Sequence, residues 1–226
     1  MHMNVCMTSS RVHAQSSFYT AGPFKRPGLG IGLGPLNGIT GANPAAAAEI
    51  VKFAVCGYVV ASPVFYNIID PAEIIRVVAK SDYAFAHEAA VHVSALNELF
   101  FTSNRLGDTS TAAQYIEAHL LHLETGEVTK VPDSTLNTLK MANGASKYLG
   151  SDDTIVLVTQ GSGDLGPQVV KLNMQTLVAE PLLDNYYGRQ FNSLNDVVMA
   201  PDGSIWFTDP SYGFAQVHYE CFSACY

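Results

Sequence analysis

Four short polar side chains stand together near the C-terminal end of the sequence, directly before an apolar run. They are Asn192, Ser193, Asn195 and Asp196, and Val197-Val198-Met199 follows them. Short amides and carboxylates at the entrance to a strand can cap and turn the chain by bonding to their own backbone. They can also point oxygen atoms into one cavity, which is what a hard cation such as Ca²⁺ requires. The spacing alone leaves both interpretations open.

The residues after this cluster predict a β-hairpin. The turn is Pro201-Asp202-Gly203-Ser204, with Asp-Gly at its centre, where a tight turn needs residues that tolerate positive φ. The returning strand, Ile205-Trp206-Phe207-Thr208, is β-branched and aromatic, which is the composition of a buried strand. The polar cluster therefore stands at the entrance to a two-stranded unit.

The stretch 185–213 as a whole resembles the signature segment of the gluconolactonase/regucalcin (senescence marker protein) family. Its first seven residues, Asn185-Tyr186-Tyr187-Gly188-Arg189-Gln190-Phe191, resemble the fungal lactonohydrolase branch in particular. The resemblance implies a six-bladed β-propeller that opens lactone rings at a divalent metal on its central axis. The other residues that carry it are Asn192-Ser193-Leu194-Asn195-Asp196, Pro201-Asp202-Gly203-Ser204-Ile205-Trp206-Phe207-Thr208-Asp209-Pro210 and Tyr212-Gly213.

Two earlier segments extend the resemblance. The stretch 86–104 is similar to the opening of the family's first blade, where a glutamate on the inner strand is a metal ligand, and Glu88 occupies that position. The stretch 139–160 is similar to the second blade, where Asn143 precedes a glycine near the cavity; a plain turn residue explains Asn143 equally well. On a regular strand His87 would point away from Glu88, so we expect His87 to be structural.

The resemblance implies a role for each of these side chains. Glu88 and Asn195 would ligate the metal, with Ca²⁺ expected and Zn²⁺ as the alternative, and Asp196 would orient Asn195 or act in catalysis beside it. A bound cation polarises a lactone carbonyl and lowers the pKa of a bound water. Asn143, Asn192 and Asp209 are candidates for substrate binding, although an Asp-Pro turn is the simpler explanation of Asp209.

Composition and strand spacing bound the fold. Of the 226 residues, 48% are hydrophobic and only 14% are charged, and short apolar runs are separated by Gly, Ser, Thr and Asn, so we predict an all-β protein. Strand-like segments recur at roughly 45–55 residues, the spacing of four-stranded blades. With the resemblance, this predicts an incomplete six-bladed β-propeller of about two and a half blades. The individual strands are expected near 91–93, 99–104, 115–122, 127–131, 155–160, 169–172 and 177–183.

The expected domains are an N-terminal extension of helix and coil (1–64), the partial propeller (65–214) and an unrelated tail (215–226). Within the extension, 43–61 reads as a helix, because Asn43 can cap it and Pro44 suits the first helical position. The segment 70–78 fits a helix or a strand.

The family's metal site also uses an asparagine from a later Pro-Asn-Gly motif and an aspartate from a blade beyond it, and neither motif has a position here. We therefore expect a truncated member of a calcium-dependent lactonase family that is inactive as it stands. The alternative is a non-catalytic partial propeller that binds partners, or its own copies, through its open edge.

Charge and targeting patterns exclude other classes. A net charge of −8 without a basic cluster argues against nucleic acid. The apolar run after Lys52 is too short to cross a bilayer. Residues 1–17 lack a secretory signal, so a cytoplasmic location is the default expectation. Cys6, Cys56, Cys221 and Cys225 form no zinc pattern.

Overall fold

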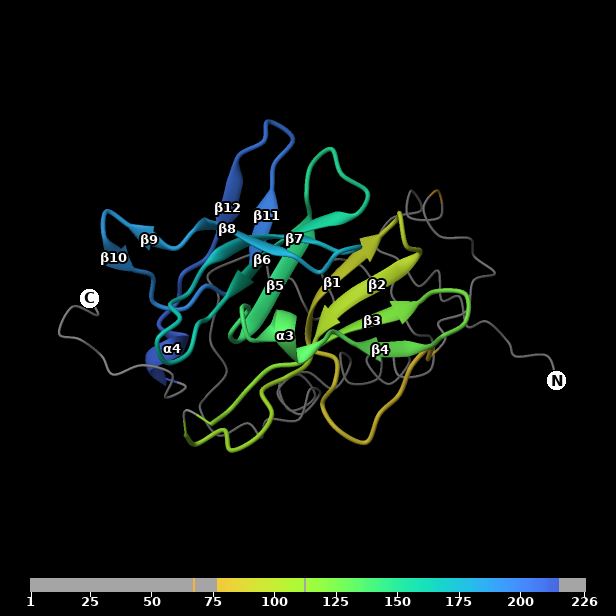
Figure 1. Ribbon diagram of the computed structural model, residues 1–226, viewed down its shortest axis with the longest axis horizontal. Coiled ribbons are helices and arrows are strands. Elements are labelled where there is room, and N and C mark those ends of the chain that lie inside the picture. The colour runs from red at the N-terminus through yellow and green to blue at the C-terminus, as the bar shows by residue number, and fades with distance from the viewer. Residues whose placement is uncertain (1–66, 68–76, 112, 216–226) are drawn as a thin grey trace, which may run out of the picture. The chain divides into compact units, whose positions relative to one another are not determined.

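The computed structural model describes residues 67, 77–111 and 113–215 (Figure 1). The predicted N-terminal extension with its helix at 43–61, most of the segment 70–78 and the tail beyond residue 215 lie outside the described residues. The chain divides into two units at Val77, and the account below concerns the second unit, which begins at Val78.

This unit is built mostly of antiparallel β-sheet. Two four-stranded sheets each run as a simple meander, in the orders β1-β2-β3-β4 and β5-β6-β7-β8 (Figure 1). The prediction of a mainly β protein is confirmed, since the described helices, α3 (Asp133–Leu136) and α4 (Tyr212–Ala215), are only four residues each. The strands of the first sheet are β1 (Glu88–Val93), β2 (Glu98–Thr102), β3 (Ala118–His122) and β4 (Val128–Lys130). Those of the second are β5 (Ala142–Lys147), β6 (Thr154–Thr159), β7 (Val169–Asn173) and β8 (Ala179–Leu183).

The hairpin predicted around Asp202-Gly203 is present. It pairs β11 (Val197–Met199) with β12 (Ile205–Phe207). Gly203 has a φ of +89°, and the Ala200 N–H donates to the Ser204 carbonyl at 2.8 Å. A second hairpin, β9 (Asn185–Tyr186) with β10 (Arg189–Gln190), lies within the segment that carries the lactonohydrolase resemblance.

The sheets pack in succession through their first strands, so that β1 lies against β5 and β5 lies against β11 (Figure 1). Strand β6 is buried along its whole length because both of its faces are covered. Ile155 and Leu157 belong to the core between the two four-stranded sheets. Val156 and Val158 belong to a second core shared with the β11–β12 hairpin. Burial on both faces explains why this strand reads as an uninterrupted apolar run.

Both inner strands carry a bulge at the same end. The pairing of β1 with β2 shifts between Glu88 and Val91, and that of β5 with β6 shifts between Ala142 and Ala145. Ala89 has a φ of +58°, which is uncommon for a residue with a side chain. A bulge breaks the alternation of a strand and re-aims the side chains beside it. Glu88 and Asn143 lie at these two irregular positions.

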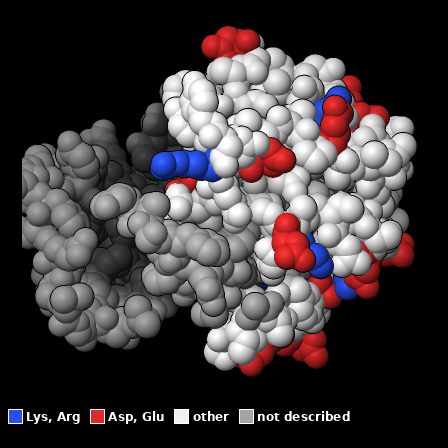
Figure 2. All heavy atoms as spheres, turned by 60° about the vertical axis from the view of Figure 1, so that its left-hand side comes forward, with Lys and Arg blue, Asp and Glu red and all other residues white. Residues whose placement is uncertain are grey.

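No helix in the described part of the chain is long and apolar enough to span a membrane. On the face in Figure 2, acidic and basic side chains are scattered singly or in small mixed groups. This face therefore presents no patch of a single charge.

Candidate functional site: a polar cavity at the inner strands

Three of the residues singled out in the sequence line one cavity of about 230 Å³. Glu88 reaches it from the start of β1, Asn143 from β5, and Asn195 from the segment before β11. Their positions in the sequence are more than 50 residues apart, and the succession of β1, β5 and β11 brings them together. The remaining lining residues are His87, Asn104, Arg105, Ile116, Gln160 and Tyr212.

The two asparagines are in direct contact. The Asn143 side-chain N–H donates to the Asn195 Oδ1 at 3.0 Å, and the Gly144 N–H donates to the Asn195 carbonyl at 3.0 Å. A β-carbon at Gly144 would lie 2.7 Å from the Asn195 carbonyl oxygen, closer than real contacts permit. Glycine at 144 therefore allows the chain before β11 to approach β5. This approach, together with the amide hydrogen bond, sets the orientation of Asn195.

Asp196 lies beside the cavity rather than in its lining. Its Oδ1 accepts a hydrogen bond from the Val197 N–H at 2.8 Å, and its side chain is exposed. Its backbone is held by Thr208, whose N–H donates to the Asp196 carbonyl at 3.1 Å. The hydrogen bond to the Asn195 amide comes from Asn143, and the orienting function expected of Asp196 stays a prediction. The catalytic function of Asp196 stays a prediction.

Glu88 is half-buried, and its electrostatic surroundings are mixed. Burial raises the pKa of its carboxyl group above the ordinary value, the charge of His87 lowers it, and the charge of Asp196 raises it again. The net result is a raised pKa, so the ionised carboxylate is less stable here than in water. The charge of Asp196 beside Glu88 adds to a negative potential that favours a cation.

The expectation that His87 points away from Glu88 is wrong. The His87 Nε2 lies 3.4 Å from the Glu88 Oε1, and both residues line the cavity. The reason is that His87 precedes β1, which begins at Glu88, and strict alternation holds only within a regular strand.

Asn192 and Asp209 lie outside the lining of the cavity. The Asp209 Oδ2 accepts from both the backbone N–H and the side-chain N–H of Asn192 at 3.1 Å, and its Oδ1 accepts from the Ser193 N–H at 2.8 Å. The Asp209 carboxylate, two residues beyond β12, thus holds the segment before Asn195 against the end of the β11–β12 hairpin. Their proposed contacts with substrate stay predictions, and their observed contacts position Asn195.

Several lining residues were missed in the sequence, notably Arg105 and Gln160. Asn104 follows β2 and Gln160 follows β6, at the same end of the sheets as Glu88 and Asn143. The signal that could have found them is a polar residue within three positions after the second strand of each unit. This signal has little specificity, because polar residues after a strand ordinarily form turns.

The donor set fits a hard cation in its chemistry but is small. Glu88 supplies a carboxylate, and Asn143 and Asn195 supply amide oxygens, which are the ligand types that Ca²⁺ accepts. Within the described residues, no three or more His, Cys, Asp and Glu side chains are grouped to hold a metal. Ca²⁺ takes about six to eight oxygen ligands, so water or substrate would complete its coordination at this cavity.

The fold and the cavity define an antiparallel β-sheet protein whose successive inner strands bring carboxylate and amide groups to one site. No family model matches the chain. The chain is 29% identical over 134 residues to the lactonohydrolase oryL of Aspergillus oryzae, covering 57% of this chain and 28% of that protein. It is 37% identical over 49 residues to a gluconolactonase of Zymomonas mobilis, covering 22% of this chain and 14% of that protein. These matches relate the chain to the gluconolactonase-like proteins over part of their length.

Two solved structures are also similar to the chain. A gluconolactonase of Xanthomonas campestris aligns with a TM-score of 0.44 and 22% identity, over 64% of this chain and 42% of that one. A second protein described as a gluconolactonase aligns with a TM-score of 0.45 and 23% identity, over 62% of this chain and 41% of that one. The chain thus spans less than half the length of each of these relatives.

Proposed function

We propose that the chain carries part of a lactone-hydrolase site, in which a cyclic ester binds at the cavity formed by Glu88, Asn143 and Asn195. The observation that carries the proposal is the convergence of these three side chains on one cavity. The sequence similarity to a lactonohydrolase and a gluconolactonase supports a lactone as the substrate class.

The two four-stranded sheets and the β11–β12 hairpin would be consecutive blades of a six-bladed β-propeller, as the resemblance implies. Support comes from the matching bulges at Glu88 and at Ala142, and from the succession of β1, β5 and β11. In a propeller, inner strands line a common central channel. Polar residues at matching points of different blades would therefore face the same axis.

A divalent cation, with Ca²⁺ proposed ahead of Zn²⁺, would be held by Glu88 and Asn195. The cation would polarise the lactone carbonyl and activate water. Asn143 holds the Asn195 amide so that Oδ1 keeps a second lone pair for a ligand. A cation bound beside Glu88 would favour the ionised carboxylate, which burial disfavours, and Asp196 would exchange protons with water at the edge of the cavity.

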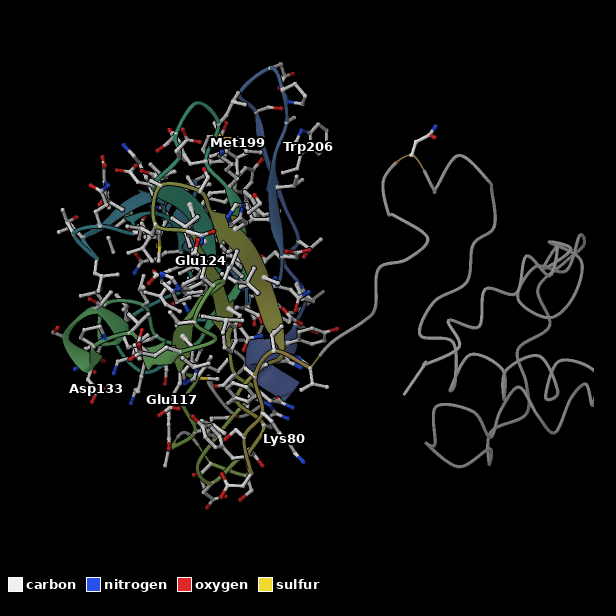
Figure 3. The ribbon with its side chains drawn as sticks, turned by 90° about the vertical axis from the view of Figure 1, so that its right-hand side faces the viewer. Lys80, Glu117, Glu124, Asp133, Met199 and Trp206 are labelled. Carbon is white, nitrogen blue, oxygen red and sulfur yellow. The ribbon has the colours of Figure 1, made fainter. Side chains whose placement is uncertain are left out.

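A second candidate is a partial propeller that self-associates instead of catalysing. The three units can be compared at one equivalent position. In each unit, the residue three positions after the polar cavity residue (Glu88, Asn143 or Asn195) pairs with an apolar residue of the neighbouring strand. In the two four-stranded sheets this apolar residue is fully buried, whereas in the β11–β12 hairpin it is Trp206, which is 67% exposed. Figure 3 shows Trp206 projecting from the hairpin. The pairs are Val91 with Phe100, Ser146 with Val156, and Val198 with Trp206.

An uncovered apolar face of this kind favours association between chains. We also propose that the chain by itself hydrolyses lactones poorly or not at all, because the cavity supplies only part of the ligand set that Ca²⁺ takes.

The experiment that tests the site uses the full chain and Ca²⁺ alone. Binding to the folded state would raise the free energy of unfolding by about 1.4 kcal/mol at a tenfold excess over Kd. Glu88→Gln should abolish this gain. The matched control is Glu124→Gln, the same change at an exposed turn residue outside the cavity lining.

Hydrolysis of gluconolactone is followed in the same samples. Stabilisation of the wild type and of the control, but not of Glu88→Gln, supports the site whether or not turnover is seen. Equal stabilisation of all three proteins, or of none, refutes the metal site and leaves the self-associating form as the better description.

A further inference from the structure

Among the described residues, Arg105 is the one arginine or lysine in the lining of the cavity that contains Glu88. It follows β2 by three residues and is half-buried. Its guanidinium Nη1 donates to the Gln114 Oε1 at 3.1 Å. Gln114 is itself 4% exposed, and its Nε2 donates to the Thr111 carbonyl at 3.1 Å. The guanidinium is therefore held in place by a buried amide that is fixed at its other end.

No carboxylate in the described part of the chain lies within ion-pair distance of Arg105. The ion pairs found there belong to Lys130, Lys147 and Lys171, and to two histidines. An arginine side chain stays charged at all ordinary pH values, and removing it from water costs free energy that a partner normally offsets. A positioned guanidinium without an anionic partner, in the wall of a cavity, has the properties of an anion receptor.

The space next to Arg105 is larger than the cavity alone. Gln114, the partner of Arg105, lines a second cavity of about 540 Å³. Ile116 lines this cavity and the cavity that contains Glu88. The Arg105–Gln114 pair therefore stands where the two cavities adjoin. A ligand whose charged end contacts the guanidinium would have the cavity of about 230 Å³ for its hydroxylated chain.

We propose that Arg105 binds the carboxylate of a polyhydroxy acid, the ring-opened form of the lactone, and so determines which end of the ligand enters the cavity. This inference rests on the proposed function. In lactone hydrolysis water adds to the carbonyl carbon and the bond from that carbon to the ring oxygen breaks. The ring oxygen takes up a proton and becomes a hydroxyl group, and the acid that forms releases a proton to become a carboxylate.

The lactone is neutral and the product is an anion, so a guanidinium favours the product. Its planar fork matches a carboxylate with two parallel hydrogen bonds. The amides of Asn104 and Asn143 in the same lining suit hydroxyl groups. Ligand recognition would thus combine one charged contact with several neutral ones.

The test measures binding of sodium gluconate to the full chain by calorimetry, with sorbitol as the neutral probe of the same carbon-chain length. We expect gluconate to bind at least tenfold more tightly than sorbitol, with an affinity that falls as salt is raised. Arg105→Gln should weaken gluconate at least tenfold and leave sorbitol unchanged. Arg105→Lys should lose less, because it keeps the charge without the fork. Arg189→Gln, at an exposed position of β10, is the charge-matched control.

Equal binding of gluconate and sorbitol by the wild type overturns the proposal, as does unchanged gluconate binding in Arg105→Gln. If Arg105→Gln fails to fold, the wild-type preference and the Arg105→Lys variant decide the question. Failure of the proposed function is a separate result. Loss of any Ca²⁺ effect, with gluconate binding still dependent on Arg105, removes the metal site and leaves the carboxylate receptor standing.

Discussion

A methyl group at position 144 tests the close approach between β5 and the segment before β11. The β-carbon of Gly144→Ala would lie 2.7 Å from both the Asn195 carbonyl oxygen and the Asp196 Cα, and it would also overlap the Asp196 carboxylate. Two of these neighbours are backbone atoms, which cannot rotate away. The segment must therefore move by about 0.7 Å to reach an ordinary contact distance, which displaces Asn195 from Asn143.

The expected cost follows from two opposing effects. Overpacking a close contact destabilises a protein by about 1–3 kcal/mol. Replacing glycine by alanine also restricts the unfolded chain, which stabilises by about 0.4–1 kcal/mol. The net expectation is a loss of about 1–2 kcal/mol in the free energy of unfolding. Any stabilisation by Ca²⁺ should fall as well, because the substitution displaces Asn195.

Urea denaturation measures this loss, and Gly166→Ala is the matched control. A β-carbon at Gly166 meets only the flexible Gln190 side chain, at 3.4 Å. We expect this variant to be as stable as the wild type or slightly more so. If Gly144→Ala is as stable as Gly166→Ala, the steric argument for the approach of β5 to Asn195 is refuted.

Three further predictions concern stability and association. Burial raises the pKa of Glu117, but hydrogen bonds from Lys130 and Tyr83 and the neighbouring positive charges lower it further, to a net value below the ordinary 4.5. The stability due to the ionised carboxylate is thus present above pH 4.5 and is lost as the pH falls through the lowered pKa. In urea titrations at successive pH values, Glu117→Gln should therefore lose less stability than the wild type over this acid range. Asp209→Asn should lower the free energy of unfolding by about 1–3 kcal/mol, because an acceptor of three N–H groups becomes partly a donor; an unchanged urea midpoint would contradict this. Trp206→Ser should reduce self-association in sedimentation experiments with little effect on unfolding, and a monomeric wild type would count against the exposed face as a contact.

Local chemistry made much of the fold predictable. The hairpin around Asp202 and Gly203 depends on residues that are neighbours in the chain, since Gly203 supplies the positive φ and the flanking residues alternate or branch as strands do. The apolar run of β6 likewise predicted a buried strand. The short helix α3 and the β9–β10 hairpin were not predicted as elements, because each has only a few residues and no period long enough to recognise.

The candidate site was only partly predictable for a different reason. The resemblance pointed to Glu88, Asn143 and Asn195, and these residues do line one cavity. It did not point to His87 or Arg105. His87 precedes β1 and so does not follow the alternation of that strand, and Arg105 is held in the lining by an amide nine residues away.

The sequence by itself determined most of the strands, the tight turn at Asp202-Gly203 and the identity of three polar groups with ligand chemistry, because those properties depend on side-chain type and on spacing within a few residues. Only the tertiary structure decided that these groups meet, that Gly144 must lack a side chain, and that a guanidinium stands in the same wall. Such facts depend on the register of paired strands and on the packing of one sheet against the next. Both are set by contacts between segments some 50 residues apart, for which no local pattern exists.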